Sequence, residues 1–160
     1  MAIFRKADQT LKDAGASYPA PYTLPAGRML THHLTERGGL TQFGVVLQQL
    51  QPGGQSSQMH WESHEDEFLY VLDGRLTVVE DGVETEIGPG DSACWPAGVA
   101  VAHCLRNHSD APATYLVAGT RDEAHNICTY PGLDMLATPA GRTHADGTPY
   151  REPDPKGETS

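Results

Sequence analysis

The stretch GQSSQMHWESHEDEFLYVLDG, residues 54–74, decides the fold. Its second half alternates inward and outward positions, which predicts a strand over residues 67–72 with Leu69 and Val71 facing inward. A shorter strand is expected over residues 57–62, and the polar residues between the two strands form a turn. The stretch therefore predicts two adjacent short strands of an all-β protein.

Four side chains that can ligate a metal fall on predicted strands. His60 and Glu62 lie two residues apart, so alternation places both on the same face. The turn that follows resets the register and lets Glu67 face inward on the next strand. A second segment, GDSACWPAGVAVAHCLRN at residues 90–107, adds His103. Imidazole and carboxylate groups together suit one divalent ion such as Fe, Mn, Ni or Zn.

The remainder of the chain also favours β structure. Glycines and prolines, 17 and 12 in number, separate short apolar runs, and no helical period persists. Asp81-Gly82 is a strong hairpin signal. Further strands are expected over 41–50, 75–80, 83–87, 92–95, 103–107 and 113–119. We therefore expect a barrel domain over 41–121, an extended arm over 1–40 with a helical turn near 7–14, and an irregular tail over 122–160 that is disordered at its end.

Composition excludes several classes of partner. The 160 residues carry a formal net charge of -10, which argues against nucleic acid and anionic membranes because such partners require clustered Lys and Arg. No apolar run is long enough to cross a membrane, and no secretory signal is visible at the N-terminus. The cysteines, three in number and without a C-x-x-C pair, suit a reducing cytoplasm. We expect a cytoplasmic protein.

The two quoted segments resemble the motifs of the cupin family. Residues 54–74 are similar to G-x5-H-x-H-x3–4-E-x6-G, and residues 90–107 to G-x5-P-x-G-x2-H-x3-N with a longer spacer. With LTQFGV, YLVAGTR, YPGLD and DGTPY elsewhere, the chain resembles a bacterial cupin-2 subfamily whose members are loosely labelled sugar-phosphate isomerases or regulators. The resemblance implies a double-stranded β-helix, the cupin jelly-roll barrel, with ligand positions at His60, Glu67 and His103.

Glu62 stands where the family has its second histidine, and three interpretations are open. Glu62 ligates the ion, which gives a site of two histidines and two carboxylates. Alternatively, it stays outside the ligand set as a general base and leaves the 2-His-1-carboxylate set that non-haem iron enzymes use. In the third interpretation the substitution has abolished metal binding.

These expectations define a metal-binding cupin that acts on a small oxygen-bearing metabolite. A spare carboxylate at Glu62 favours sugar-phosphate or keto-enol isomerisation, with Glu62 as the catalytic residue. A metal-dependent dioxygenase is the first alternative, and a metabolite-binding module without metal is the second. We also expect a homodimer, because the N-terminal arm is available to add strands to a second subunit.

Other conspicuous side chains have simpler interpretations. His64 is expected on the solvated turn, while Cys94 and Cys104 are read as small buried hydrophobes. Trp61 and Trp95 are expected to pack rather than to bind ligand. No site role is assigned to the tail residues His125, Tyr130 and His144.

Overall fold

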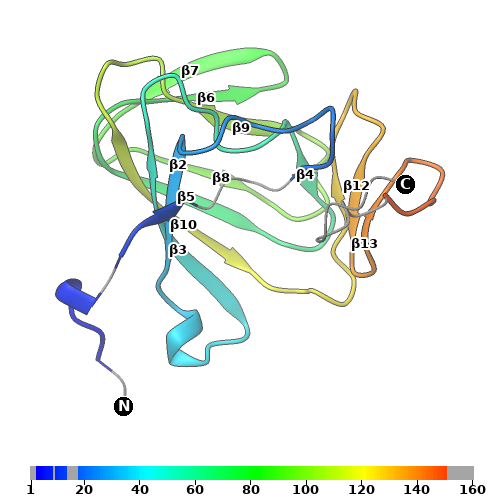
Figure 1. Cartoon of the computed structure of the whole chain (residues 1–160), viewed down its shortest axis with the longest axis horizontal. Helices are drawn as coiled ribbons and strands as arrows, with labels where there is room; N and C mark the ends of the chain where they lie inside the picture. The colour runs from blue at the N-terminus through cyan, green and yellow to red at the C-terminus, as the bar shows by residue number, and fades with distance from the viewer. Residues whose placement is uncertain (1–2, 9, 14–17, 151–160) are drawn as a thin grey trace, which may run out of the picture.

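The computed structural model describes residues 3–8, 10–13 and 18–150, and nearly all regular structure in them is β (Figure 1). Single turns of 3-10 helix cover Lys6–Asp8 and Glu36–Gly38. Within these ranges no helix is long and apolar enough to cross a membrane. The strands are β1 Lys12–Asp13, β2 Met29–His33, β3 Phe43–Leu50, β4 Trp61–Glu62, β5 Glu67–Asp73, β6 Leu76–Glu80, β7 Val83–Ile87, β8 Ser92–Trp95, β9 His103–Arg106, β10 Ala113–Thr120, β11 Cys128–Thr129, β12 Leu136–Thr138 and β13 Gly141–Thr143.

The strands form antiparallel sheets around one main core. The six-stranded sheet has the order β1-β2-β3-β10-β5-β8, and the three-stranded sheet that faces it has the order β7-β6-β9. A four-stranded sheet, β13-β12-β11-β4, lies at one end of the molecule (Figure 1). The predicted all-β jelly-roll architecture is therefore confirmed.

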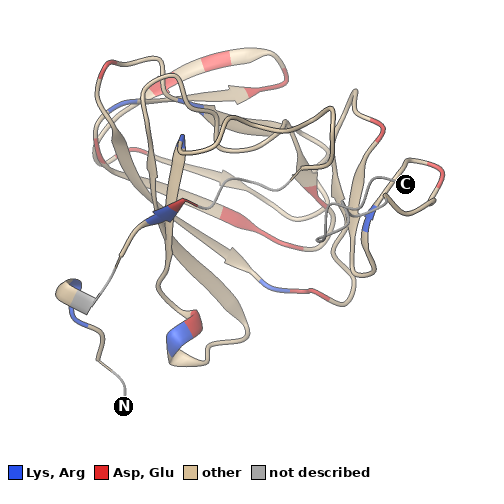
Figure 2. Cartoon of the chain, in the orientation of Figure 1, with Lys and Arg blue, Asp and Glu red and all other residues tan. Residues whose placement is uncertain are grey.

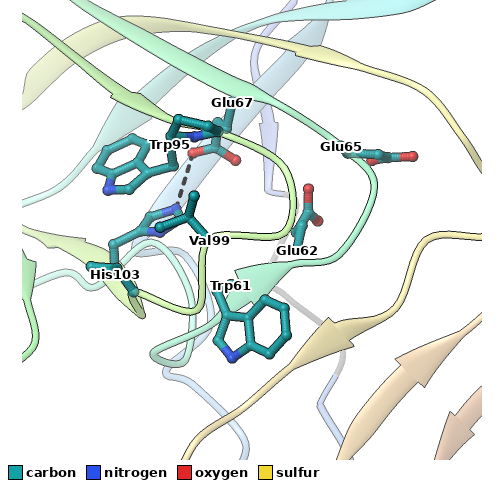
Figure 3. A pocket seen from close by; sticks show the side chains of 9 residues that line it. Trp61, Glu62, Glu65, Glu67, Trp95, Val99 and His103 are labelled. Atoms are coloured by element: carbon teal, nitrogen blue, oxygen red, sulfur yellow. Dashed lines mark ion pairs between the residues drawn. The ribbon is translucent and has the colours of Figure 1, made fainter.

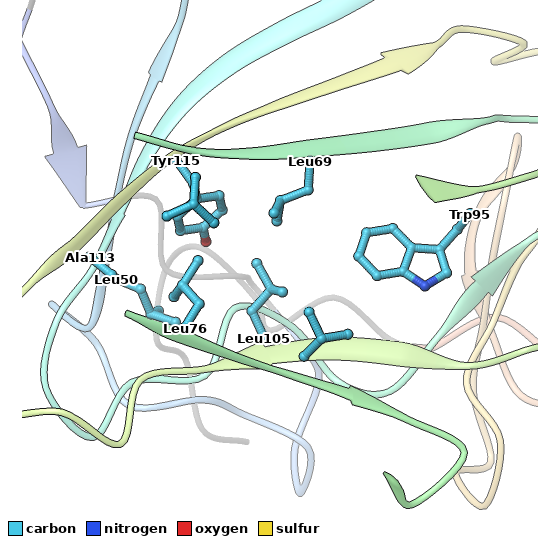
Figure 4. Packing of buried hydrophobic residues seen from close by; sticks show 9 residues of the cluster. Leu50, Leu69, Leu76, Trp95, Leu105, Ala113 and Tyr115 are labelled. Carbon is cyan, nitrogen blue, oxygen red and sulfur yellow. The ribbon is translucent and has the colours of Figure 1, made fainter. Parts of the chain in front are cut away.

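Strand alternation builds the core between the two facing sheets. On β5 the inward side chains Leu69 and Val71 are fully buried, and the opposite sheet contributes Leu76 and Leu105 (Figure 4). Tyr115 on β10 completes the packing with no exposed surface. Burial of a large apolar side chain stabilises a fold by about 1.5–3 kcal/mol, so these residues dominate the stability of the barrel.

The predicted hairpin at Asp81-Gly82 is also confirmed. β6 and β7 pair across it from Leu76↔Ile87 to Glu80↔Val83. Both turn residues have positive φ, 46° at Asp81 and 82° at Gly82. A two-residue turn of this kind matches the right-handed twist of the flanking strands.

Regular structure begins earlier than Thr41, which corrects the expectation for the N-terminal segment. β2 pairs with β3 over five residues, and β1 pairs with β2. Without this pairing the edge of β3 would expose a row of unpaired N–H and C=O groups. β2 satisfies these groups by forming a strand along that edge. The helical turn expected near residues 7–14 is displaced to Lys6–Asp8. Part of that expected turn lies outside the described residues.

The expected strand over residues 57–62 and the expected irregular tail also differ from the structure. Only Trp61–Glu62 forms a strand, and His60 joins the ladder through a single bridge to His103. That short strand pairs with β11, so the segment after residue 122 is ordered by β4 and by a second apolar cluster that includes Tyr18 and Met135. The expected disorder of the tail's end concerns residues 151–160, which lie outside the described residues.

Candidate metal centre

His60, Glu67 and His103 converge at the end of the barrel nearest β4. Backbone hydrogen bonds join the two histidines in both directions, with His103 N to His60 O at 2.9 Å and His60 N to His103 O at 3.2 Å. The carboxylate of Glu67, the first residue of β5, lies 3.5 Å from Nε2 of His103 (Figure 3). One ligand atom from each of the three side chains lies within 4.8 Å of the others. This spacing can place three donors around one ion.

His103 is held in an orientation that leaves its ring nitrogens without hydrogen-bond partners among the described residues. Its ring stacks on the indole of Trp95 with a centroid distance of 3.8 Å and an interplanar angle of 7°. The residue is only 3% exposed, and neither ring nitrogen has a hydrogen-bond partner among the described residues. A buried polar group without a partner costs about 1–3 kcal/mol. A metal ion bound to the Nε2 atom would remove part of that cost.

One ring nitrogen of His60, Nδ1, has hydrogen-bond partners among the described residues, whereas Nε2 has none there. Its Nδ1 lies 2.9 Å from the carbonyl oxygen of Gln58 and 3.2 Å from Oγ of Ser57. A proton on Nδ1 donated to Gln58 leaves Nε2 as the lone-pair donor, which is the arrangement that orients metal-binding histidines. Burial lowers the pKa of His60. The ring is thereby kept in the neutral form that can ligate.

A small space adjoins Glu67 and His103, whereas His60 is not part of its lining. It has a volume of about 10 Å³ and is lined by the side chains of Glu62, Glu67 and His103 together with both tryptophans (Figure 3). Such a volume accommodates about one water-sized occupant. The donor types, the unpartnered nitrogens and this space together fit a single divalent ion.

Glu62 lies beside this group in a second cluster. One ligand atom each from Glu62, His60 and Cys128 lies within 4.8 Å of the others, and the backbones of Glu62 and Cys128 pair directly. Burial is the main cause that raises the pKa of Glu62 to about 7, and the charges of Glu67 and Glu65 add to this effect. A hydrogen bond with Asn126 acts in the opposite direction and lowers the pKa. Glu62 therefore shares His60 with the group of His60, Glu67 and His103, and it lines the same small space as Glu67 and His103.

A larger cavity opens next to His60 and Glu62, between the barrel and the C-terminal strands. Its volume is about 410 Å³, and its wall includes Asn126, Cys128 and Tyr130 from the tail. Burial raises the pKa of the Cys128 thiol to about 12, so this cysteine is a weak nucleophile at neutral pH. A metabolite-sized compound could reach the metal group through this cavity.

The tail residues in this wall were not anticipated. Tyr130 had no expected role, yet it is 6% exposed and lines the cavity; Cys128 and Asn126 carried no individual signal. The two-residue pairing of β11 with β4 and hydrogen bonds of residues 63 and 64 with Asn126 and Ile127 bring them to the site, and such a short strand has no readable periodicity.

Of the side chains to which the sequence assigned no site role, some lie where they were expected and others do not. His64 is exposed and Cys104 is buried, as expected, but Cys94 is exposed rather than buried. Trp95 packs against the core, as expected, and also stacks on the ring of His103. His125 and His144 form exposed pairs with Asp122 and Asp134.

Comparisons with known proteins agree with this geometry. Residues 46–119 match the Cupin_2 family, described as a cupin domain. The solved structure of a sugar phosphate isomerase from a cupin superfamily, from Silicibacter pomeroyi, superposes with a TM-score of 0.79 and 37% identity over 89% of this chain and 93% of that chain. A polyketide cyclase from Streptomyces resistomycificus shares the fold at 21% identity, with a TM-score of 0.61 over 76% of this chain and 80% of that chain.

One curated relative is similar in sequence. Quercetin 2,3-dioxygenase from Bacillus subtilis is 31% identical over 108 residues, which cover 62% of this chain and 32% of that protein. The chain therefore spans about a third of the length of the curated relative it matches.

Proposed function

This chain belongs to the cupin superfamily, and from the geometry of its site we propose that it is a metal-dependent isomerase of a small oxygen-bearing metabolite. His60, Glu67 and His103 would hold one divalent ion, whose identity among Fe, Mn, Ni and Zn is open. When bound, the ion supplies Lewis-acid polarisation of a substrate oxygen. The ion is the proposed cofactor, and a small molecule is the proposed partner.

The observation that carries the proposal is the place of Glu62. Its carboxylate borders both the ion-sized space and the 410 Å³ cavity, yet it lies outside the tight group of His60, Glu67 and His103. A carboxylate in this position is available to take a proton from the carbon next to a carbonyl and to return it to the neighbouring atom. This is the proton transfer that keto-enol and aldose-ketose isomerisations require.

Nearby groups hold Glu62 in place. Asn126 makes a hydrogen bond with Glu62, while its own Oδ1 accepts from the backbone N–H of His64 at 3.0 Å. Without an ion, burial beside other carboxylates raises the pKa of Glu62 to about 7, and the positive charge of a bound ion would lower it towards the range in which the carboxylate accepts a proton at neutral pH. Asn126 is therefore a positioning residue in this proposal. The similarity to a sugar phosphate isomerase supports the same class of reaction.

A metal-dependent dioxygenase is the second candidate function. Two histidines and one carboxylate form the ligand set used by non-haem iron oxygenases, and the similarity to quercetin 2,3-dioxygenase favours this chemistry. In this case Glu62 would not transfer the proton of the rate-limiting step, and dioxygen would be consumed.

The test is deuterium exchange at the carbon next to the carbonyl, measured by NMR in D2O with metal-loaded protein and a panel of small hydroxy aldehydes and ketones. We expect exchange that requires metal and falls at least about 100-fold in Glu62→Gln with metal content unchanged, since general bases contribute factors of about 10²–10⁴. Glu86→Gln, on the exposed hairpin strand β7, is the control and should keep the wild-type rate. Exchange that survives in Glu62→Gln, or oxygen uptake without exchange, contradicts the isomerase.

We also propose that the outer face of the six-stranded sheet pairs two copies of the chain. Phe43, Phe68, Tyr70 and Leu72 are each 38–44% exposed there, and an apolar groove of about 500 Å³ runs beside Phe68. Exposed apolar patches of this kind mark interaction surfaces. Light scattering after gel filtration should give the dimer mass for wild type and the monomer mass for Phe68→Glu; a wild-type monomer contradicts the proposal.

A cytoplasmic location stays a proposal. It is supported by the free state of Cys94, Cys104 and Cys128, which suits a reducing compartment. Fractionation of cells that express the chain tests it, and recovery outside the cytoplasm contradicts it.

A further inference from the structure

The wall of the 410 Å³ cavity is acidic, and this limits the substrates that the proposed isomerase could accept. Glu62, Glu65 and Glu123 all contribute to the lining, and no Lys or Arg does so among the described residues. The ion-sized space next to it is also lined by Glu62 and Glu65, so the two spaces share a carboxylate border. His103, 3% exposed and without hydrogen-bond partners, faces the smaller space and marks it as a place for a ligand.

The carboxylate of Glu65 is fixed in this position by a hydrogen bond from the backbone. Glu65 accepts a hydrogen bond from the backbone N–H of Asp122 at 2.7 Å, which ties the turn after β4 to the segment after β10. Figure 2 shows acidic residues on both segments. Together with Glu67, the charges of Glu65 and Glu123 already exceed what one divalent ion neutralises, whatever the protonation of Glu62. The surroundings of the substrate therefore stay negative even with the ion in place.

Two basic side chains near this end of the molecule, Arg121 and Arg142, do not line the cavity. Arg121 lies 3.7 Å from the carboxylate of Glu36. Arg142 lies over the ring of Tyr18, 5.2 Å from the centroid, and is not part of the cavity lining. Arg142 stands behind the wall, where burial raises the pKa values of Cys128 and Tyr130 and the charge of Arg142 lowers them in part. Neither arginine presents its fork of N–H donors as part of the lining.

We propose that the substrate is a polyhydroxylated carbonyl compound without phosphate or carboxylate, in other words an unphosphorylated sugar. Carboxylates are hydrogen-bond acceptors only, so the lining calls for a ligand that brings donors. Sugar hydroxyls donate to such oxygens, whereas a phosphate dianion brings acceptors and like charge. This inference rests on the proposed isomerase and departs from the phosphorylated substrate that the name of the Silicibacter pomeroyi structure would suggest.

The test measures binding of inorganic phosphate, ribose 5-phosphate and ribose to metal-loaded protein by calorimetry. The wild type is compared with a Glu65→Gln/Glu123→Gln double variant, in which the side-chain amide oxygen at position 65 can still accept the hydrogen bond of Asp122. We expect both phosphate compounds to bind the double variant at least about tenfold more tightly than the wild type, with the difference shrinking in high salt. A Glu84→Gln/Glu86→Gln double variant of β7 is the matched control, since it changes the net charge equally but lies outside the cavity lining. It should bind phosphate as the wild type does.

Two results overturn the inference: an unchanged phosphate affinity in the Glu65→Gln/Glu123→Gln variant, or tighter binding of ribose 5-phosphate than of ribose by the wild type. Deuterium exchange separates these failures from failure of the proposed function. Exchange with sugar phosphates but not with free sugars contradicts only the substrate class. Discrimination against phosphate without exchange on any compound supports the charge selectivity and contradicts the isomerase.

Discussion

The two ends of the barrel are built by the same strands but differ in chemistry. On β5 the inward positions run from Glu67 at one end to Leu69 and Val71 at the other, and on β9 they run from His103 to Leu105. The far end is filled by buried apolar side chains, whereas the end near β4 holds the candidate ligands Glu67 and His103 and the cavities (Figures 3 and 4). Because alternate side chains of a strand point to the same face, one strand can contribute both buried core residues and candidate ligands.

Both ends also contain a buried polar group without a partner among the described residues, and the contrast between them is instructive. The hydroxyl of Tyr115 has no hydrogen-bond partner and sits among Leu and Val side chains. The ring nitrogens of His103 lack partners too, but they adjoin the carboxylate of Glu67 and an ion-sized space. The first group is a cost to stability alone, whereas the second would become a ligand in the proposed metal site.

The largest expected effect comes from opening a cavity at the close-packed end. Leu69→Ala should lower the free energy of unfolding by about 2–5 kcal/mol, because Leu69 is fully buried and its neighbours can relax only partly. Urea denaturation measures this change. Metal content per folded molecule should stay at the wild-type value; metal loss would show that the two ends are not independent.

The next effect concerns the metal end. Adding a divalent ion at about 100 times its dissociation constant should stabilise the wild type by about 2.7 kcal/mol. His103→Leu keeps an apolar side chain against Trp95 but removes a ligand, so this stabilisation should vanish. Thermal unfolding with and without the ion measures it, and an unaltered response in His103→Leu would exclude the histidine as a ligand.

The smallest effect is expected at Tyr115. Tyr115→Phe removes the unpartnered hydroxyl and keeps the ring, so the free energy of unfolding should rise by about 1 kcal/mol in both metal-free and metal-loaded protein. Denaturation curves of the two forms check this. A destabilised variant would mean that the hydroxyl has a partner, such as a buried water.

The elements that could be predicted from sequence are those with local signals. Alternation identifies β5, Asp81-Gly82 identifies the hairpin, and the spacing of His60, Glu67 and His103 anticipates a group that the structure does bring together. β2 and the strands β11 to β13 could not be predicted in this way. These segments form strands because of long-range pairing with β3 and β4. Strands of two or three residues are also too short to show an alternation of apolar and polar side chains.

The central claim is that His60, Glu67 and His103 hold one divalent ion while Glu62 stands outside the ligand set. Elemental analysis of protein purified without chelators or a polyhistidine tag tests it directly, with Glu62→Gln, Glu62→His and His103→Leu in parallel. We predict about one equivalent of a divalent metal in the wild type and in Glu62→Gln, and almost none in His103→Leu. A metal-free wild type whose Glu62→His variant gains metal would contradict the claim, because it would show that Glu62 has emptied the site.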